Sequence, residues 1–175
     1  MAWSAKYLPT LKTSIAIMAL TASVAQAEEM LSTPTGDVIL TVSGDIQQTN
    51  VGDTAQFDMD MLKAMDAETF VTTTIWTDGD QTFTGVPLNA LLDAVGVDSG
   101  TLSASAINDY TVEIPVEDET TSQAIVAYMN NGEIMSVRDK GPLWIVYPYD
   151  SDDSLRAEVV FSRSIWQLDR IKVAE

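Results

Sequence analysis

The 175-residue sequence contains no cysteine and no histidine. The first absence removes disulfides, thiolate metal ligands and cysteine nucleophiles. The second removes the commonest general base and the commonest metal-binding side chain. Stability must therefore come from the apolar core, and most familiar zinc sites and nucleophilic active sites are excluded.

Positive charge is also scarce, because 9 Lys and Arg stand against 26 Asp and Glu, for a formal net charge of −17. Such a surface repels phosphate backbones and anionic lipid, so we expect no nucleic-acid partner and no direct membrane binding by the mature protein. The sequence has no long linker, no solenoid-length repeat and no low-complexity block after its first residues. One compact domain is the simplest interpretation.

Residues 1–27 have the features of a signal peptide. Two lysines precede a short apolar run at 15–20, and the small-residue sequence Ala25-Gln26-Ala27 follows. The run is shorter than the roughly 20 apolar residues that span a bilayer. We expect cleavage after Ala27, export to the periplasm and a mature domain at 28–175.

Alternating polarity and β-branched runs predict many strands and few helices. Asn131-Gly132 predicts a hairpin turn, and Pro87 and Gly96 are placed to begin and end a helix at 88–95. Asp58 can cap a second short helix that carries Met59, Leu62 and Met65. The strands are predicted at 38–42, 71–76, 101–106, 110–115, 124–129, 143–147 and 170–173. Without βαβ alternation, this pattern favours a single α+β domain on mixed or antiparallel sheet.

Five short motifs in this sequence occur in an order that can be compared with known protein families. They are TFTGVPLNALL at 82–92, Asn108-Asp109-Tyr110, Asn131-Gly132, KGPLWIVYP at 140–148, and Trp166 near the C-terminus. The set resembles the molybdopterin-binding domain of sulfite-oxidase-type enzymes, with its G-V-P-L helix start, D-G-Y-like strand entry, N-G turn and G-x-P-L-R-like segment. The resemblance covers roughly residues 70 to 173 and implies that domain's fold.

The departures from this family's pattern bear on function. The resemblance implies a metal-binding cysteine near 72–76, yet the sequence has none, so molybdenum ligation of that type is excluded. Trp144 replaces the arginine of G-x-P-L-R, and Asn108-Asp109-Tyr110 lacks the central glycine. The remaining pattern is similar to small periplasmic pterin-binding proteins that regulate a membrane-bound cyclic-dinucleotide enzyme. This implies a reduced pterin as ligand, no metal, and the periplasmic domain of an inner-membrane signalling protein as partner.

A pterin is flat, and its 2-amino and N3–H groups form two parallel donors that one carboxylate accepts. Asp109 is the candidate acceptor, with Asn108 beside it. Trp76, Tyr110 and Trp166 are candidates for the stacking faces. Each has an ordinary alternative, since an aspartate at a turn caps backbone groups and a tryptophan fills a core. Trp144 lies within a predicted strand, and we expect it in the core rather than the site.

Apart from Lys63, the basic residues of the predicted mature domain lie between Arg138 and Lys172. Arg138 and Arg163 flank the segments of the resemblance and are candidates for a ligand phosphate or carboxylate. Ordinary surface pairing is the alternative for most of these cations. The acid-rich stretches at 117–119 and 150–153 do not match a calcium loop, and we expect them to be solvated.

Three functional hypotheses follow. We favour an exported pterin-binding sensor, because loss of the thiolate favours binding over turnover. The second is a molybdopterin-dependent oxidoreductase in which an oxygen ligand replaces sulfur on the metal. The third is a ligand-free interaction module, which requires that Trp76, Asp109 and Trp166 do not converge on one cleft.

Overall fold

The computed structural model describes Met1 and residues 31–175. Apart from Met1, the predicted signal peptide and its cleavage site lie outside the described residues. Within the described part, no helix combines the length and the apolar character needed to cross a membrane.

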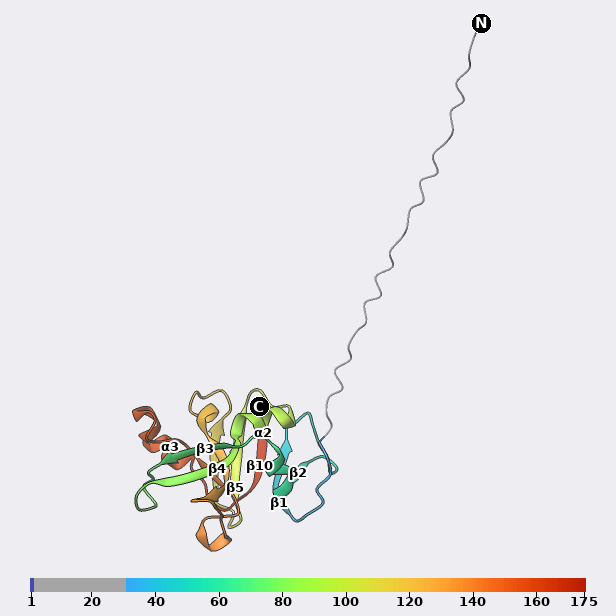
Figure 1. The fold of residues 1–175 in the computed structure, drawn as a ribbon. Coiled ribbons are helices and arrows are strands. Elements are labelled where there is room, and N and C mark those ends of the chain that lie inside the picture. The colour runs from blue at the N-terminus through green and yellow to red at the C-terminus, as the bar shows by residue number, and fades with distance from the viewer. Residues whose placement is uncertain (2–30) are drawn as a thin grey trace.

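Strands β2, β1, β10, β5 and β6 form the first sheet, in that order. Its centre is a parallel pair made by the first and last strands of the described chain, β1 and β10, while its other pairings are antiparallel. The bounds are β1 Val38–Gly44, β2 Ala55–Asp58, β5 Thr101–Ala106, β6 Thr111–Pro115 and β10 Leu168–Ala174. In Figure 1, β1 and β2 lie on the right of the molecule.

The second sheet has the order β3-β4-β7-β8, and β9 also pairs with β7. Its pairings are antiparallel. The bounds are β3 Glu68–Thr72, β4 Gln81–Pro87, β7 Ile125–Asn130, β8 Glu133–Ile134 and β9 Trp144–Val146. β3 and β4 lie on the left in Figure 1, where α3 Glu158–Ser162 is also found.

The other helices are short. α1 Met59–Ala64 begins at Asp58, whose carboxylate accepts the backbone N–H of Met61 at 2.8 Å. α2 Leu88–Val95 buries Leu88, Leu91, Leu92 and Val95 and ends at Gly96, which has a left-handed φ of 70°. The described residues also contain three 3₁₀ turns: η1 Thr121–Gln123, η2 Val137–Asp139 and η3 Asp153–Arg156.

The structure confirms the predicted single α+β domain with mixed and antiparallel sheets. The hairpin at Asn131-Gly132 is present, and both residues have positive φ, at 51° and 83°. Two local predictions are wrong. β3 ends at Thr72 rather than continuing to Trp76, because the backbone N–H of Thr73 bonds the Asp150 side chain instead of a strand. α2 spans 88–95 as predicted, but Pro87 is not its first helical residue, because it ends β4 with ψ at 132° and directly precedes α2.

The segment that follows α3 joins the two sheets. Ile145 in β9 donates its backbone N–H to Ile165 O at 2.9 Å, and Trp144 forms a single β-bridge with Trp166. Leu168, the first residue of β10, donates to Leu143 O at 3.0 Å. These bonds hold Trp166 beside Trp144, although the two tryptophans lie on different segments of the chain.

Gly85, the glycine of the G-V-P-L segment, lies where the backbone of β7 leaves no room for a side chain on β4. The pairing register shifts between Thr84 and Gly85. A Cβ atom at Gly85 would lie 2.2 Å from Val126 O and 2.5 Å from the Cα of Ala127. Because both are backbone atoms, no side chain can move aside to make room.

Gly85→Ala is therefore expected to lower the free energy of unfolding by roughly 1–3 kcal/mol, the usual cost of overpacking. Urea unfolding followed by circular dichroism measures the change. Gly36→Ala is the control, since a Cβ there meets only ordinary contacts, the nearest being Asp58 Oδ2 at 3.5 Å. Equal midpoints for the two variants would contradict this account of Gly85.

Candidate functional site

A cavity of about 500 Å³ opens where the loop after β3, the β5–β6 turn and α3 meet. We call it the Trp76 pocket. Most of its lining is apolar or aromatic, and its polar side chains come mainly from α3 and the residues after it. The lining residues are Ile75, Trp76, Ala106, Asn108, Tyr110, Glu158, Phe161, Ser162, Ser164, Ile165 and Trp166.

Trp76 is the centre of an aromatic cluster in the wall of this pocket. Its ring centroid lies 5.7 Å from that of Trp166, 5.9 Å from those of Trp144 and Phe161, and 6.4 Å from that of Tyr149. All four pairs are edge-to-face, the arrangement that aromatic quadrupoles favour. Trp144 is fully buried, whereas Trp166 is 37% exposed and Tyr110, on the opposite turn, is 58% exposed. Aromatic surface therefore remains available at the mouth.

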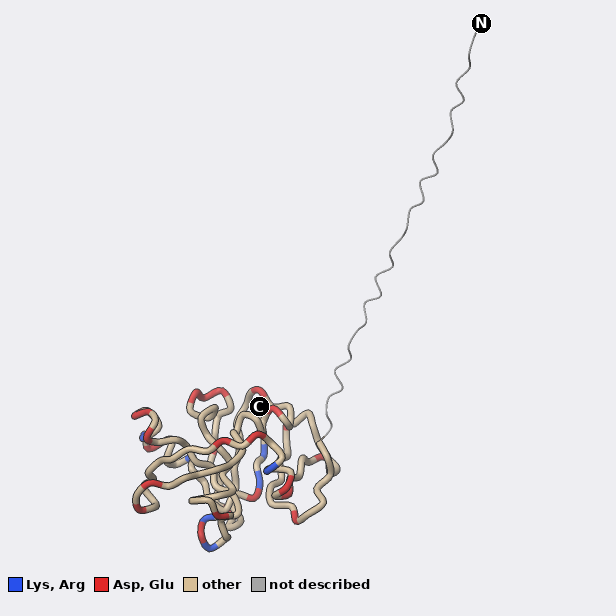
Figure 2. The backbone as a smooth tube through the Cα atoms, in the orientation of Figure 1, with Lys and Arg blue, Asp and Glu red and all other residues tan. Residues whose placement is uncertain are grey.

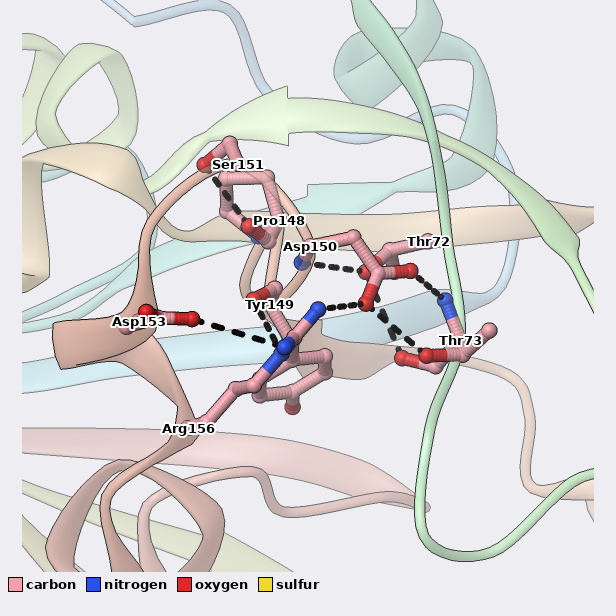
Figure 3. A network of polar contacts seen from close by, with 8 residues as sticks. All are labelled: Thr72, Thr73, Pro148, Tyr149, Asp150, Ser151, Asp153 and Arg156. Carbon is pink, nitrogen blue, oxygen red and sulfur yellow. Dashed lines mark hydrogen bonds and ion pairs between the residues drawn. The ribbon is translucent and has the colours of Figure 1, made fainter.

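The loop that carries Trp76 is held by Asp150. One carboxylate oxygen accepts the backbone N–H of Thr73 at 2.5 Å, and the other accepts the Thr73 hydroxyl at 2.9 Å and an Arg156 N–H at 2.7 Å. Figure 3 shows Asp150 between Thr73 and Arg156, and the backbone N–H of Asp150 donates to the hydroxyl of Thr72. Arg156 also donates to Tyr149 O at 3.1 Å. These contacts tie the Trp76 loop to the segment that leads into α3.

The same contacts change the acidity of Asp150. The backbone N–H of Thr73, followed by the guanidinium of Arg156, lowers the pKa of Asp150 to about 2. The carboxylate is therefore ionised at neutral pH, the form that accepts all three hydrogen bonds.

Two serines on the α3 side of the pocket are oriented by internal hydrogen bonds. Ser162 Oγ donates to Val159 O at 2.7 Å, and Ser164 Oγ donates to Val160 O at 3.0 Å. Ser164 also bonds the buried hydroxyl of Tyr149 at 2.5 Å. Burial raises the pKa of Tyr149 to about 12, so this phenol is protonated at neutral pH.

Residues 37–173 match the family of oxidoreductase molybdopterin binding domains. The chain belongs to this family. The match covers most of the chain, including both sheets and every segment that lines the Trp76 pocket. It confirms the resemblance that the sequence motifs indicated.

Among solved structures, this family member is similar to the sulfane dehydrogenase SoxCD from Paracoccus pantotrophus, with 18% identity and a TM-score of 0.57. The likeness covers 77% of this chain and 37% of that one, and at this identity it concerns the fold. A comparison with curated proteins gave no match.

Molybdopterin, the cofactor in the family's description, combines a pterin ring with a metal-binding part and a phosphate. The aromatic walls of the Trp76 pocket suit the flat ring. The metal-binding part has no thiolate to complete its coordination, because the 175 residues contain no cysteine. The phosphate has no cation to bind, because no Lys or Arg is among the described lining residues. The residues therefore fit a pterin ring better than a metal-loaded cofactor, and we assign no reaction step to a metal.

The pocket brings together four of the residues predicted from sequence: Trp76, Asn108, Tyr110 and Trp166. Asn108 Oδ1 accepts the backbone N–H of Tyr110 at 3.2 Å, which orients its amide group. Trp144 lies in the core, as expected, and contacts both pocket tryptophans.

Three other predicted residues lie elsewhere. Asp109 has a left-handed φ of 68° at the turn, and its carboxylate pairs with Arg170 rather than lining the pocket. Arg163 is 9% exposed and donates to Asp118 at 3.0 Å. Arg138 is exposed in η2 and is not a lining residue. Neither arginine is thus placed to meet a ligand anion in the pocket.

Acidic side chains in the stretches 117–119 and 150–153 accept hydrogen bonds from other groups of the protein. Thr120, through its hydroxyl and its backbone N–H, lowers the pKa of Asp118 to about 2, and Arg163 adds to the effect. Asp152 accepts the backbone N–H of Ser154 at 2.8 Å and caps η3.

Sequence reasoning missed the contribution of α3. Glu158, Phe161, Ser162 and Ser164 all line the pocket, and Glu158 is its one carboxylate among the described residues. A five-residue helix is too short to produce a recognisable apolar period, so no helix was predicted there. The sequence offered one local sign of polar lining here, the two serines Ser162 and Ser164 on either side of Arg163.

Asp150→Asn should lower the free energy of unfolding at about pH 7 by about 1 kcal/mol, since it weakens charge-assisted bonds in a partly exposed site. Because folding depresses this pKa, the contribution is complete above the unfolded value of about 4 and disappears as the pH falls through about 2. Urea unfolding of both proteins at several pH values measures the difference.

Asp153→Asn is the control, because its carboxylate is 99% exposed and reaches Arg156 only at 3.4 Å. The role of Asp150 would be refuted if Asp150→Asn lowered the free energy of unfolding no more than Asp153→Asn does. It would also be refuted if the loss caused by Asp150→Asn grew as the pH was lowered.

Proposed function

We propose that this chain binds a reduced pterin, without molybdenum, in the Trp76 pocket. The observation that carries the proposal is the convergence of Trp76, Tyr110 and Trp166 on one cavity in a chain that lacks the cysteine expected of its family. The cavity volume of about 500 Å³ falls within the usual range of small-molecule sites. A bicyclic ring with a short side chain is of suitable size.

The chemistry of the lining favours binding over turnover. It contains no imidazole and no thiol, the groups that most often transfer protons or attack substrates. Each well-placed aromatic contact contributes about 0.5–1.5 kcal/mol beyond burial. Several such contacts together with hydrogen bonds would give affinity in the micromolar range.

We further propose that the protein is exported and reports ligand occupancy to the periplasmic domain of an inner-membrane cyclic-dinucleotide enzyme. The signal-peptide features at 1–27 and the similarity to periplasmic pterin-binding proteins support this role. Ile75 and Tyr110 at the pocket are 65% and 58% exposed, so a bound ligand would alter an apolar surface that a partner could contact.

Membership of the oxidoreductase family favours a second candidate, a molybdopterin-dependent oxidoreductase with an oxygen ligand on the metal. Metal analysis of protein purified from its native cells separates the two. Stoichiometric molybdenum would support the oxidoreductase and contradict our proposal.

Calorimetric titration with tetrahydromonapterin is expected to show one binding site in the micromolar range. Trp166→Ala and Tyr110→Ala should each weaken binding about three- to tenfold, because each removes one aromatic contact. Ile134→Ala is the control, since Ile134 is 54% exposed and does not line the pocket. Absence of heat at high protein concentration, or equal effects of all three variants, would count against the proposal.

The export proposal makes a separate prediction. Protein expressed with its own N-terminus should be recovered from the periplasmic fraction with a mass that starts at Glu28. Recovery of the full-length mass from the cytoplasm would contradict export and leave the ligand proposal untouched.

A further inference from the structure

The polar side chains on the α3 side of the Trp76 pocket are oriented to accept hydrogen bonds, and they lie among the apolar Phe161 and Ile165. A hydroxyl carries one proton, and Ser162 and Ser164 give theirs to Val159 O and Val160 O. Toward any further partner, both serine oxygens therefore offer lone pairs; Ser162 is the exposed one of the two, and Ser164 is 3% exposed.

The buried phenol of Tyr149 reinforces this orientation. Tyr149 is 1% exposed, and its hydroxyl forms a hydrogen bond with Ser164 Oγ. Because a buried O–H needs an acceptor and Ser164 has already donated its proton, Tyr149 must be the donor of this bond. Ser164 cannot reverse its direction without leaving the phenol proton unpaired.

Glu158 adds a carboxylate to the same wall. It is exposed at the start of α3 and lines the pocket, and an ionised carboxylate only accepts hydrogen bonds. Donors come from other lining residues, such as the amide of Asn108. We call Glu158, Ser162 and Ser164 the acceptor wall.

Basic side chains near the pocket are directed to other groups. Arg156 pairs with Asp150, Arg163 with Asp118, and Arg170 with Asp109. The ammonium of Lys140 lies over the ring of Trp166, 5.6 Å from its centroid, and is not in the lining. Figure 2 shows far more acidic than basic positions along the described backbone. Glu158 is the one charged side chain among the described lining residues, so the charge of the acceptor wall is negative.

We propose that the acceptor wall binds the N–H donor edge of an uncharged flat heterocycle and rejects phosphorylated ligands. A phosphate offers no N–H donor and would bring its negative charge toward Glu158. This inference rests on the proposed function and specifies which pterins the pocket accepts.

The test compares 7,8-dihydroneopterin with its monophosphate, two probes that share a ring and differ in one phosphate. Calorimetry with the full protein at about 0.1 M salt, where the screening length is about 10 Å, measures both affinities. The unphosphorylated probe is expected to bind at least tenfold more tightly. Glu158→Lys should remove most of this preference by strengthening binding of the monophosphate.

Asp53→Lys is the matched control, because Asp53 is exposed in the turn between β1 and β2, is not a lining residue, and undergoes the same charge change. It should leave the preference nearly unchanged. Ser162→Ala should weaken binding of the unphosphorylated probe about three- to tenfold, because one acceptor is lost.

The outcomes separate the two proposals. If both probes bind the wild type equally, or if Asp53→Lys changes the preference as much as Glu158→Lys, the acceptor wall does not select ligands and this inference fails while pterin binding stands. If neither probe binds, both proposals fail. Tighter binding of the monophosphate overturns the inference directly.

Discussion

The ring of Trp144 is fully buried, with its centroid 5.2 Å from that of Phe83, 5.9 Å from that of Trp76 and 6.1 Å from that of Trp166. It thus connects the core of the second sheet with the two tryptophans of the pocket. The resemblance places an arginine at this position and a metal-binding cysteine near Trp76. At or near these positions this chain has two tryptophans in edge-to-face contact, so aromatic packing stands where the family pattern implies a cation and a metal anchor.

Polar contacts hold the remaining walls of the pocket in place. Asp150 joins the Trp76 loop to the segment before α3, and Tyr149 holds Ser164 in place. The Asp118 carboxylate draws Arg163 away from the pocket, although both neighbours of Arg163 line it. Internal pairing of polar groups therefore decides which of them line the pocket.

Much of the fold followed from local signals. Strand alternation, the Asp58 cap, Gly96 and the Asn131-Gly132 turn each act within a few residues, so their structures could be predicted. The resemblance included Tyr110 and Trp166 in its ordered motifs and placed Trp76 near the family's metal-binding cysteine, and the family's fold brings these segments to one place. Asp109 is adjacent in sequence to two lining residues, but the left-handed turn directs its carboxylate to Arg170, on a distant strand. Such long-range pairings leave no local pattern, and neither does α3, which supplies Glu158.

In the proposed complex, a flat ring contacts Trp76 and Trp166 in the pocket. The most direct test follows the indole ¹⁵N–¹H signals by NMR while tetrahydromonapterin is added. We expect large shifts for Trp76 and Trp166 and a smaller one for Trp144, whose ring is fully buried. Saturation of binding with both pocket indoles unmoved would contradict the proposed contact.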